Sequence, residues 1–161
     1  MLKRVSGLLT GLLRDQHVMF IRPDSYQNAI ETVIKKMGEL YPELANEHIL
    51  SELLTRELAF PTTLAHGVAA PHLHCFALTE PICFLAHISK EIELRTYEGE
   101  PVKLLFALLS QESEPELHLR ILAEIATITS TPEKVQSLMK AKTSGEFFQL
   151  VKVGKTDTQS P

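Results

Sequence analysis

The sequence predicts an α/β (α+β) fold in which a single mixed β-sheet is flanked by helices, in one domain spanning residues 1–161. Apolar residues recur at helical spacing before residue 60 and again after residue 115. Two short, nearly uninterrupted apolar runs lie between these helical regions, at 82–88 and 102–109. A length of 161 residues fits one domain with a proper hydrophobic core.

The first predicted helix follows Asp24, which resembles a capping-box residue because Gln27 comes three positions later. Its apolar stripe closes at Gly38. A second helix is predicted from residue 42 or 46 to Leu58, again from apolar spacing. The region before residue 60 is therefore expected to be a helical scaffold.

The middle of the chain is predicted to form the sheet. Residues 68–75 are typical of a strand or extended arm, although Pro71 excludes a fully paired central strand. Residues 82–88 predict a buried strand, and the charged segment 91–100 contains a turn. The most apolar run, 102–109, predicts a central strand covered on both faces.

Helices return in the C-terminal third. Pro115 suits the first position of a helix, and Thr131 is expected to cap a short one. Ser144 is expected to cap the last helix, which ends near Gly154. The sequence thus predicts a core from about 8 to 153 and a flexible polar tail at 154–161.

The N-terminal segment has two interpretations. Lys3 and Arg4 precede a short apolar run, as in a signal peptide. However, Arg14 and Asp15 follow this run at once, no small-x-small cleavage site appears, and the run is too short to span a bilayer. We therefore expect a lead segment packed on the domain, with no membrane insertion and a cytoplasmic location.

Composition narrows the functional classes. The net charge of −4 and the pI near 6.0 differ from the basic excess of nucleic-acid-binding proteins, so no nucleic acid is expected as a partner. Cys75 and Cys83 lie among apolar residues without a CxxC pair. We expect both to be buried thiols in a reducing compartment.

The stretch from Phe60 to His74 contains three of the seven histidines, His66, His72 and His74, and no other ionisable side chain. Small residues precede Pro71 and leave space beside the ring of His72. Histidine can act as a nucleophile at neutral pH. His72 is therefore the candidate nucleophile, with His74 on the same face of the arm; His66 and His74 are interpreted as ordinary structural histidines.

Two further residues are candidates for the same site. His118 lies on the buried face of its predicted helix, where a histidine is usually a satisfied core residue. Its partner is either a backbone carbonyl or the site itself. Arg56 ends a helix just before the histidine stretch, where the helix dipole favours a cation. Its guanidinium also suits a phosphate or carboxylate clamp.

A zinc-dependent hydrolase is a more distant alternative. The His72-x-His74 spacing occurs in zinc sites, and His66 or His118 would supply a third ligand. No Asp or Glu lies between residues 60 and 78, although zinc catalysis usually needs a carboxylate. We therefore expect no metal. The sequence also contains no GxSxG and no glycine-rich phosphate loop.

Three separated motifs carry a resemblance to a known family. The motifs are LTRE at 54–57 followed by TTLAHGVAAPH at 62–72, PVKLLFALL at 101–109, and LHL at 117–119 followed by Leu122. Together they resemble the enzyme IIA domains of the bacterial phosphotransferase system, of the fructose/mannitol type that includes the nitrogen-related IIA. The resemblance covers about residues 8–153.

This resemblance implies the family's fold and a phosphotransferase activity used in sugar transport or nitrogen regulation. His72 would accept a phosphoryl group from the phosphohistidine of the carrier protein HPr or its nitrogen-branch paralogue. Arg56 and His118 would stabilise the added charge, and no cofactor would be needed. Downstream partners would be a IIB domain or a regulated transporter or kinase. A free-standing chain is more similar to the nitrogen-related branch than to a sugar permease subunit.

The sequence departs from the family pattern in the histidine stretch. Thr63 and Ala65 stand where the family has glycines, His66 occupies a variable position, and Ala70 replaces the usual Ile. A β-branched Thr63 is costly if that position has a positive φ. A second hypothesis therefore stays open, in which the chain is a regulatory binding module that works without phosphorylation.

Overall fold

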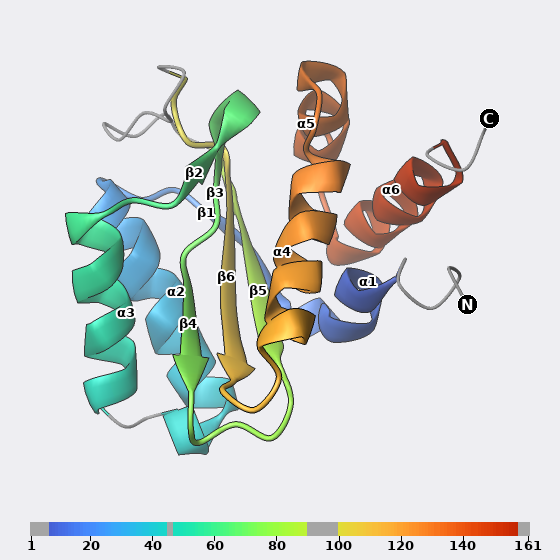
Figure 1. The fold of residues 1–161 in the computed structure, drawn as a ribbon. Helices are drawn as coiled ribbons and strands as arrows, with labels where there is room; N and C mark the ends of the chain where they lie inside the picture. Colours follow the sequence, from blue (N-terminus) through green and yellow to red (C-terminus); the bar gives the residue numbers. More distant parts are fainter. Residues whose placement is uncertain (1–6, 45–46, 90–99, 158–161) are drawn as a thin grey trace.

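The computed structural model describes residues 7–44, 47–89 and 100–157. In this part of the chain a six-stranded mixed sheet lies between two layers of helices (Figure 1), as the sequence predicts. The strands are β1 (Val18–Ile21), β2 (Thr63–Leu64), β3 (Val68–Ala69), β4 (His72–Cys75), β5 (Ile82–Ile88) and β6 (Leu104–Gln111).

The helices are α1 (Leu8–Leu12), α2 (Tyr26–Leu40), α3 (Glu47–Ala59), α4 (Pro115–Ile128), α5 (Pro132–Met139) and α6 (Ser144–Asp157). Three short 3-10 helices lie in the connections: η2 (Asp15–His17) between α1 and β1, η3 (Pro42–Leu44) between α2 and α3, and η4 (Ala65–Gly67) between β2 and β3.

Strand β6 is the central strand, as predicted. It pairs antiparallel with β5 on one side and parallel with both β3 and β4 on the other. Val68 faces Leu104 and His72 faces Leu108, so β3 and β4 keep one register and form a single strand that is interrupted at Pro71. Proline has no N–H to donate to a sheet ladder, which explains why the interruption falls there.

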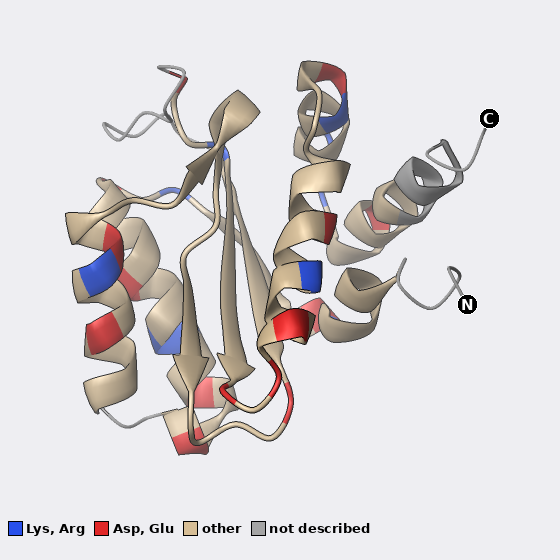
Figure 2. Cartoon of the chain, in the orientation of Figure 1, with Lys and Arg blue, Asp and Glu red and all other residues tan. Residues whose placement is uncertain are grey.

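Two hydrophobic cores lie on opposite faces of the sheet. Helices α2 and α3 cover one face, and α1, α4, α5 and α6 cover the other (Figure 1). All residues of β5 and β6 are buried, and the strands carry no charged side chain, in contrast to the helices (Figure 2). Leu73 and Cys75 of β4 point into the first core, so the alternation of a strand turns His72 and His74 toward α4.

The N-terminal segment is packed on the domain, as predicted. The Glu124 carboxylate on α4 accepts hydrogen bonds from the backbone N–H groups of Gly7, Leu8 and Leu9, at 3.1 to 3.3 Å. These groups form the N-terminal end of α1, where a negative charge is favourable. No helix among the described residues is both long enough and apolar enough to cross a membrane.

Four predictions of local structure are wrong. The region before residue 60 is not wholly helical, because β1 pairs parallel with β5 at the sheet edge. The cap of α2 is Ser25, whose hydroxyl accepts the N–H of Asn28, rather than Asp24. Helix α2 continues past Gly38 to Leu40, and β6 begins two residues later than predicted and includes two polar residues, Ser110 and Gln111.

The C-terminal helices mostly follow the prediction. Pro115 occupies the first turn of α4, and the Thr131 hydroxyl caps α5 by accepting the N–H of Lys134. At α6 the capping hydroxyl belongs to Thr143 rather than Ser144. The helix continues to Asp157, three residues beyond its predicted end near Gly154. Residues 158–161 and most of the predicted turn segment 91–100 lie outside the described residues.

Both cysteines are buried free thiols, as expected. Burial raises the pKa of Cys83 to about 12.

Candidate functional site

His72 opens β4 directly after the Pro71 interruption, and its side chain is half-buried. Its Nδ1 atom lies 2.8 Å from the backbone oxygen of Ala70. A carbonyl oxygen only accepts hydrogen bonds, so Nδ1 carries the proton and donates it. In the neutral ring the lone pair then lies on Nε2, which is the nitrogen available for reaction.

A chain of hydrogen bonds holds the Ala70 peptide in place. Ala70 donates its N–H to the backbone oxygen of Thr62 at 2.8 Å. Thr62 donates its own N–H to the Glu57 carboxylate at 2.7 Å, and the Tyr26 hydroxyl donates to the same carboxylate oxygen at 2.6 Å. The ring of His72 is therefore oriented, through the backbone of Ala70 and Thr62, by a buried carboxylate at the end of α3.

The Glu57 side chain, which accepts the last hydrogen bonds of this chain, is only 3% exposed. Burial raises the pKa of its carboxyl group, while the hydrogen bonds from Tyr26 and Thr62 and the nearby His72 act in the opposite direction. Burial, followed by the charge of Glu57, raises the pKa of Tyr26. The resemblance of residues 54–57 to the family motif drew attention to Glu57, but no sequence signal identified Tyr26.

His118 lies on the buried face of α4, as predicted, and is 2% exposed. Its Nδ1 is hydrogen-bonded to the hydroxyl of Ser110 on β6. Its Nε2 is buried and has no hydrogen-bond partner among the described residues. The ring centroid of His118 is 5.2 Å from that of His72 and 4.2 Å from that of His74. The structure therefore brings the three histidines together.

The electrostatics of this cluster keep His118 neutral. Burial, with smaller contributions from charge on His74 and His72, lowers the pKa of His118 to about 4. At neutral pH this imidazole offers either one donor or one acceptor at Nε2, depending on the orientation of the Ser110 hydroxyl. Ser110 is a site residue that sequence reasoning missed, because it lies at the polar end of an otherwise apolar strand.

Arg56 is exposed in the last turn of α3. It lines an open hollow at the end of β4 together with His74, Phe76 and Glu112. Its guanidinium makes no hydrogen bond or ion pair with any other described residue. The structure thus places Arg56 next to His74 in one hollow and leaves its charge available.

The loop before His72 differs from the expectation drawn from its missing glycines. Thr63 pairs with Ala69 as part of an antiparallel ladder, and neither Thr63 nor Ala65 has a positive φ. The left-handed positions are instead His66, with φ 65°, and Gly67, with φ 81°. The cost expected for a β-branched residue at position 63 therefore does not arise.

Within the described residues, no group of three or more His, Cys, Asp or Glu side chains is arranged to hold a metal ion. The zinc-hydrolase alternative therefore has no ligand set in this part of the chain.

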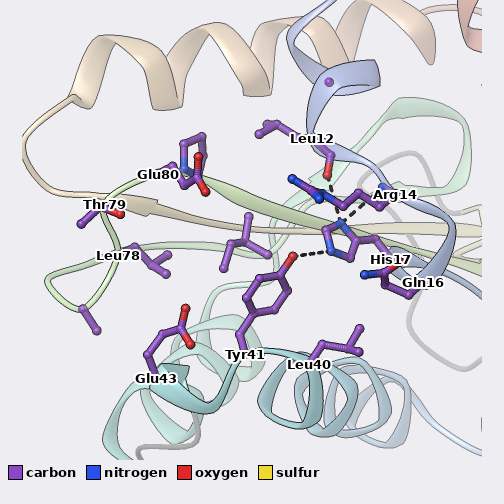
Figure 3. Close-up of a pocket in the computed structure, with 14 residues that line it drawn as sticks. Leu12, Arg14, Gln16, His17, Leu40, Tyr41, Glu43, Leu78, Thr79 and Glu80 are labelled. Carbon is purple, nitrogen blue, oxygen red and sulfur yellow. Dashed lines mark hydrogen bonds between the residues drawn. The ribbon is translucent and has the colours of Figure 1, made fainter.

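A second hollow lies away from the three histidines (Figure 3). The buried ring of His17 contacts two of the residues that line this hollow. Its Nδ1 lies 3.0 Å from the Leu12 oxygen, and its Nε2 lies 2.6 Å from the Tyr41 hydroxyl. Because a carbonyl oxygen only accepts, Nδ1 donates to Leu12 and Nε2 accepts from Tyr41. The backbone N–H of Arg14 also points at Nδ1, but at 3.4 Å this is the longer contact. Burial lowers the pKa of His17. This arrangement ties the N-terminal segment to α2, and it involves none of the residues around His72.

Comparison with known proteins agrees with this geometry. Residues 12–153 match the family described as "Phosphoenolpyruvate-dependent sugar phosphotransferase system, EIIA 2", and the chain belongs to this family. The nitrogen regulatory protein of Pseudomonas aeruginosa is 28% identical over 127 residues, which are 79% of this chain and 82% of the relative. The resemblance seen in the sequence is thereby confirmed.

Two solved structures share the fold. The nitrogen regulatory protein IIA-Ntr from Neisseria meningitidis has a TM-score of 0.79 and 24% identity, covering 89% of this chain and 99% of that one. Enzyme IIAMTL from Escherichia coli, solved in complex with phosphorylated enzyme IIBMTL, has a TM-score of 0.71 and 12% identity, covering 88% and 97%. At these identities the likeness supports the fold alone.

Proposed function

We propose that this chain, as a single IIA domain, carries a phosphoryl group on Nε2 of His72. The observation that supports this proposal is the 2.8 Å contact between Nδ1 of His72 and the Ala70 oxygen. It holds the ring in one orientation and leaves the lone pair on the other nitrogen. A nucleophile that is already oriented removes much of the entropic cost of the reaction.

The transfer needs no cofactor. The lone pair on Nε2 of His72 attacks the phosphorus of a phosphohistidine on a carrier protein, forming a new N–P bond. The N–P bond of the donor breaks, and its electron pair stays on the donor nitrogen. The other ring nitrogen of the donor holds a proton, so the donor leaves as neutral imidazole. His72 keeps the proton on its Nδ1 throughout, donated in a hydrogen bond to the Ala70 oxygen. Positioning and charge stabilisation supply most of the catalysis.

Arg56 and His118 are the residues proposed to stabilise the added charge. The guanidinium of Arg56 lies in the hollow beside β4 and carries a permanent positive charge. Neutral His118 can offer an N–H from Nε2 when Ser110 donates to Nδ1. Its buried position also limits the access of water, which would hydrolyse the phosphohistidine.

We propose a phosphocarrier of the HPr type as the donor. Large exposed apolar side chains lie beside the site residues in sequence: Phe60 is 83% exposed and Phe76 is 88% exposed, with Leu58 and Leu119 also exposed. Exposed apolar side chains of this kind are typical of protein contacts. The description of the family as phosphoenolpyruvate-dependent supports a cytoplasmic location for this proposed reaction.

The downstream partner would be a IIB domain or a regulated transporter or kinase. The relative named as a nitrogen regulatory protein supports the regulatory branch. In the alternative function the same surface binds a partner without phosphorylation, and the exposed Phe60 and Phe76 are compatible with that function as well.

Phosphotransfer in vitro separates these two functions. Purified protein is mixed with enzyme I, HPr and phosphoenolpyruvate, and intact mass and alkaline peptide mapping locate the phosphate. We expect one phosphate on His72 in the native protein and in a His48→Ala control, and none in His72→Ala. A native protein that stays unmodified with cognate donors would contradict the carrier function and favour the binding module.

A further inference from the structure

His74 lies closer to His118 than His72 does. The ring centroids of His74 and His118 are 4.2 Å apart with 34° between the ring planes, whereas those of His72 and His118 are 5.2 Å apart. His74 is exposed on its other side, where it lines the hollow that contains Arg56. It therefore contacts the buried imidazole of His118 and shares a hollow with the Arg56 guanidinium.

The strand geometry places His74 beside the reacting ring. His72 and His74 are two positions apart on β4, so they share one face and are separated by about 6.6 Å along the strand. His74 pairs in register with Ser110, the residue that binds His118. The three imidazoles and the Ser110 hydroxyl thus lie on the face of the sheet that α4 covers.

The charge of a phosphoryl group is not matched by the residues already assigned to the site. A phosphoryl group carries up to about two negative charges at neutral pH. Arg56 supplies one positive charge, and His118 stays neutral because burial lowers its pKa to about 4. A second cation is therefore expected, and an exposed imidazole is a side chain that gains charge near neutral pH.

We propose that His74 is a further phosphoryl-stabilising residue, which becomes protonated when His72 is phosphorylated and donates a hydrogen bond to a phosphoryl oxygen. This inference rests on the proposed function. The proton comes from solvent and returns to it when the phosphoryl group leaves, and no covalent bond to His74 forms. An anion beside an imidazole favours its charged form.

Other charged groups surround His74 on both sides. The carboxylates of Glu52 and Glu112 and the guanidinium of Arg56 line the same hollow as His74. His72 and His118 face it from β4 and α4. The phosphoryl group adds the charge that shifts this balance, so proton uptake is expected to accompany phosphorylation.

The test is the equilibrium constant for phosphoryl exchange between HPr and this chain, measured by intact mass across pH 6.5 to 9. His74→Gln keeps a hydrogen-bonding side chain without a titrating charge, and His74→Lys supplies a fixed cation. His48→Gln, on the exposed first turn of α3, is the matched control. Thermal unfolding of each variant checks the fold, which an exposed substitution should leave intact.

We expect His74→Gln to lower the equilibrium constant for phosphorylation at pH 6.5 by about tenfold, because one charge-assisted hydrogen bond to the phosphoryl group is lost. The deficit should shrink toward pH 9 as native His74 loses its proton, while His74→Lys should stay near the native value or above it at every pH. A packing role for His74 would give no such pH profile and no rescue by lysine.

Two results would overturn the proposal, and they are distinguishable. If native protein is phosphorylated on His72 and His74→Gln matches it at every pH, His74 has no role and the proposed function stands. If native protein accepts no phosphate, the proposed function fails and the role of His74 fails with it.

Discussion

The backbone oxygen of Ala70 accepts a hydrogen bond from Nδ1 of His72 at 2.8 Å. Because this contact decides which nitrogen holds the lone pair, the peptide before Pro71 controls the chemistry of the site. That peptide is in turn tied to Glu57 through Thr62. The orientation of the His72 ring therefore depends on a buried carboxylate fifteen positions earlier in the chain.

Removal of the Tyr26 hydroxyl tests this dependence. In Tyr26→Phe the buried Glu57 carboxylate loses a donor at 2.6 Å, and we expect the free energy of unfolding in urea to fall by about 1 to 3 kcal/mol. Phosphorylation of His72 should also slow, because the Thr62 and Ala70 peptides lose their anchor. Gln27→Ala, on the exposed side of the same helix, is the control. Equal stability of the two variants would contradict the proposed support.

Replacement of Gly67 should be costly for two reasons. Its φ of 81° disfavours any residue with a Cβ, and an added Cβ would lie 2.7 Å from the backbone oxygen of Pro101. We expect Gly67→Ala to lower the free energy of unfolding by about 2 kcal/mol or more.

The neighbouring position is the matched control. His66 already has a positive φ of 65°, so His66→Gly relieves strain and should change stability by less than about 1 kcal/mol. The prediction fails if Gly67→Ala is as stable as the native protein.

Acid should destabilise the fold through its buried histidines. Burial lowers the pKa of both His17 and His118 below the unfolded value of 6.5, to about 4 for His118. The unfolded state then binds more protons, so stability is complete above about pH 6.5 and decreases as pH falls toward the folded pKa. For His118 the loss at pH 5 is up to about 2 kcal/mol.

Urea unfolding at pH 5 and pH 7 measures this loss. Glu57 contributes with the opposite sign, since its raised pKa favours the folded state as pH falls. The comparison is therefore between native protein and His118→Gln, which should show a smaller decrease between pH 7 and pH 5. An unchanged pH dependence in the variant would exclude His118 as a source.

If the HPr-type carrier binds the exposed apolar side chains near the site, removal of one of them should weaken carrier binding without affecting the chemical step. Phe76 is 88% exposed and lines the hollow with Arg56 and His74. Phe76→Ser should raise the KM for the HPr-type carrier several-fold while leaving kcat nearly unchanged and stability within about 0.5 kcal/mol. Phe20→Ser, at the opposite edge of the sheet, should leave the KM unchanged. Equal KM values for the two variants would indicate that the carrier does not bind at Phe76.

Features encoded by neighbouring residues were predicted well from the sequence. The bounds of β5, the interruption at Pro71 and the cap at Thr131 all agree with the structure. The candidate residues His72 and His118 also meet in space. Strand β1 was missed because it has only four residues, and one of them, Phe20, is exposed at the sheet edge.

Contacts between distant elements could not be predicted in this way. The hydrogen bond between Tyr26 and Glu57 joins α2 to α3, and the contact between the rings of His74 and His118 depends on how α4 crosses β4. Helix crossings and strand registers are set by the packing of the whole core, which leaves no local pattern in the sequence. Local patterns in the sequence thus predict most of the elements and the candidate residue His72, whereas core packing specifies the residues that orient and surround His72.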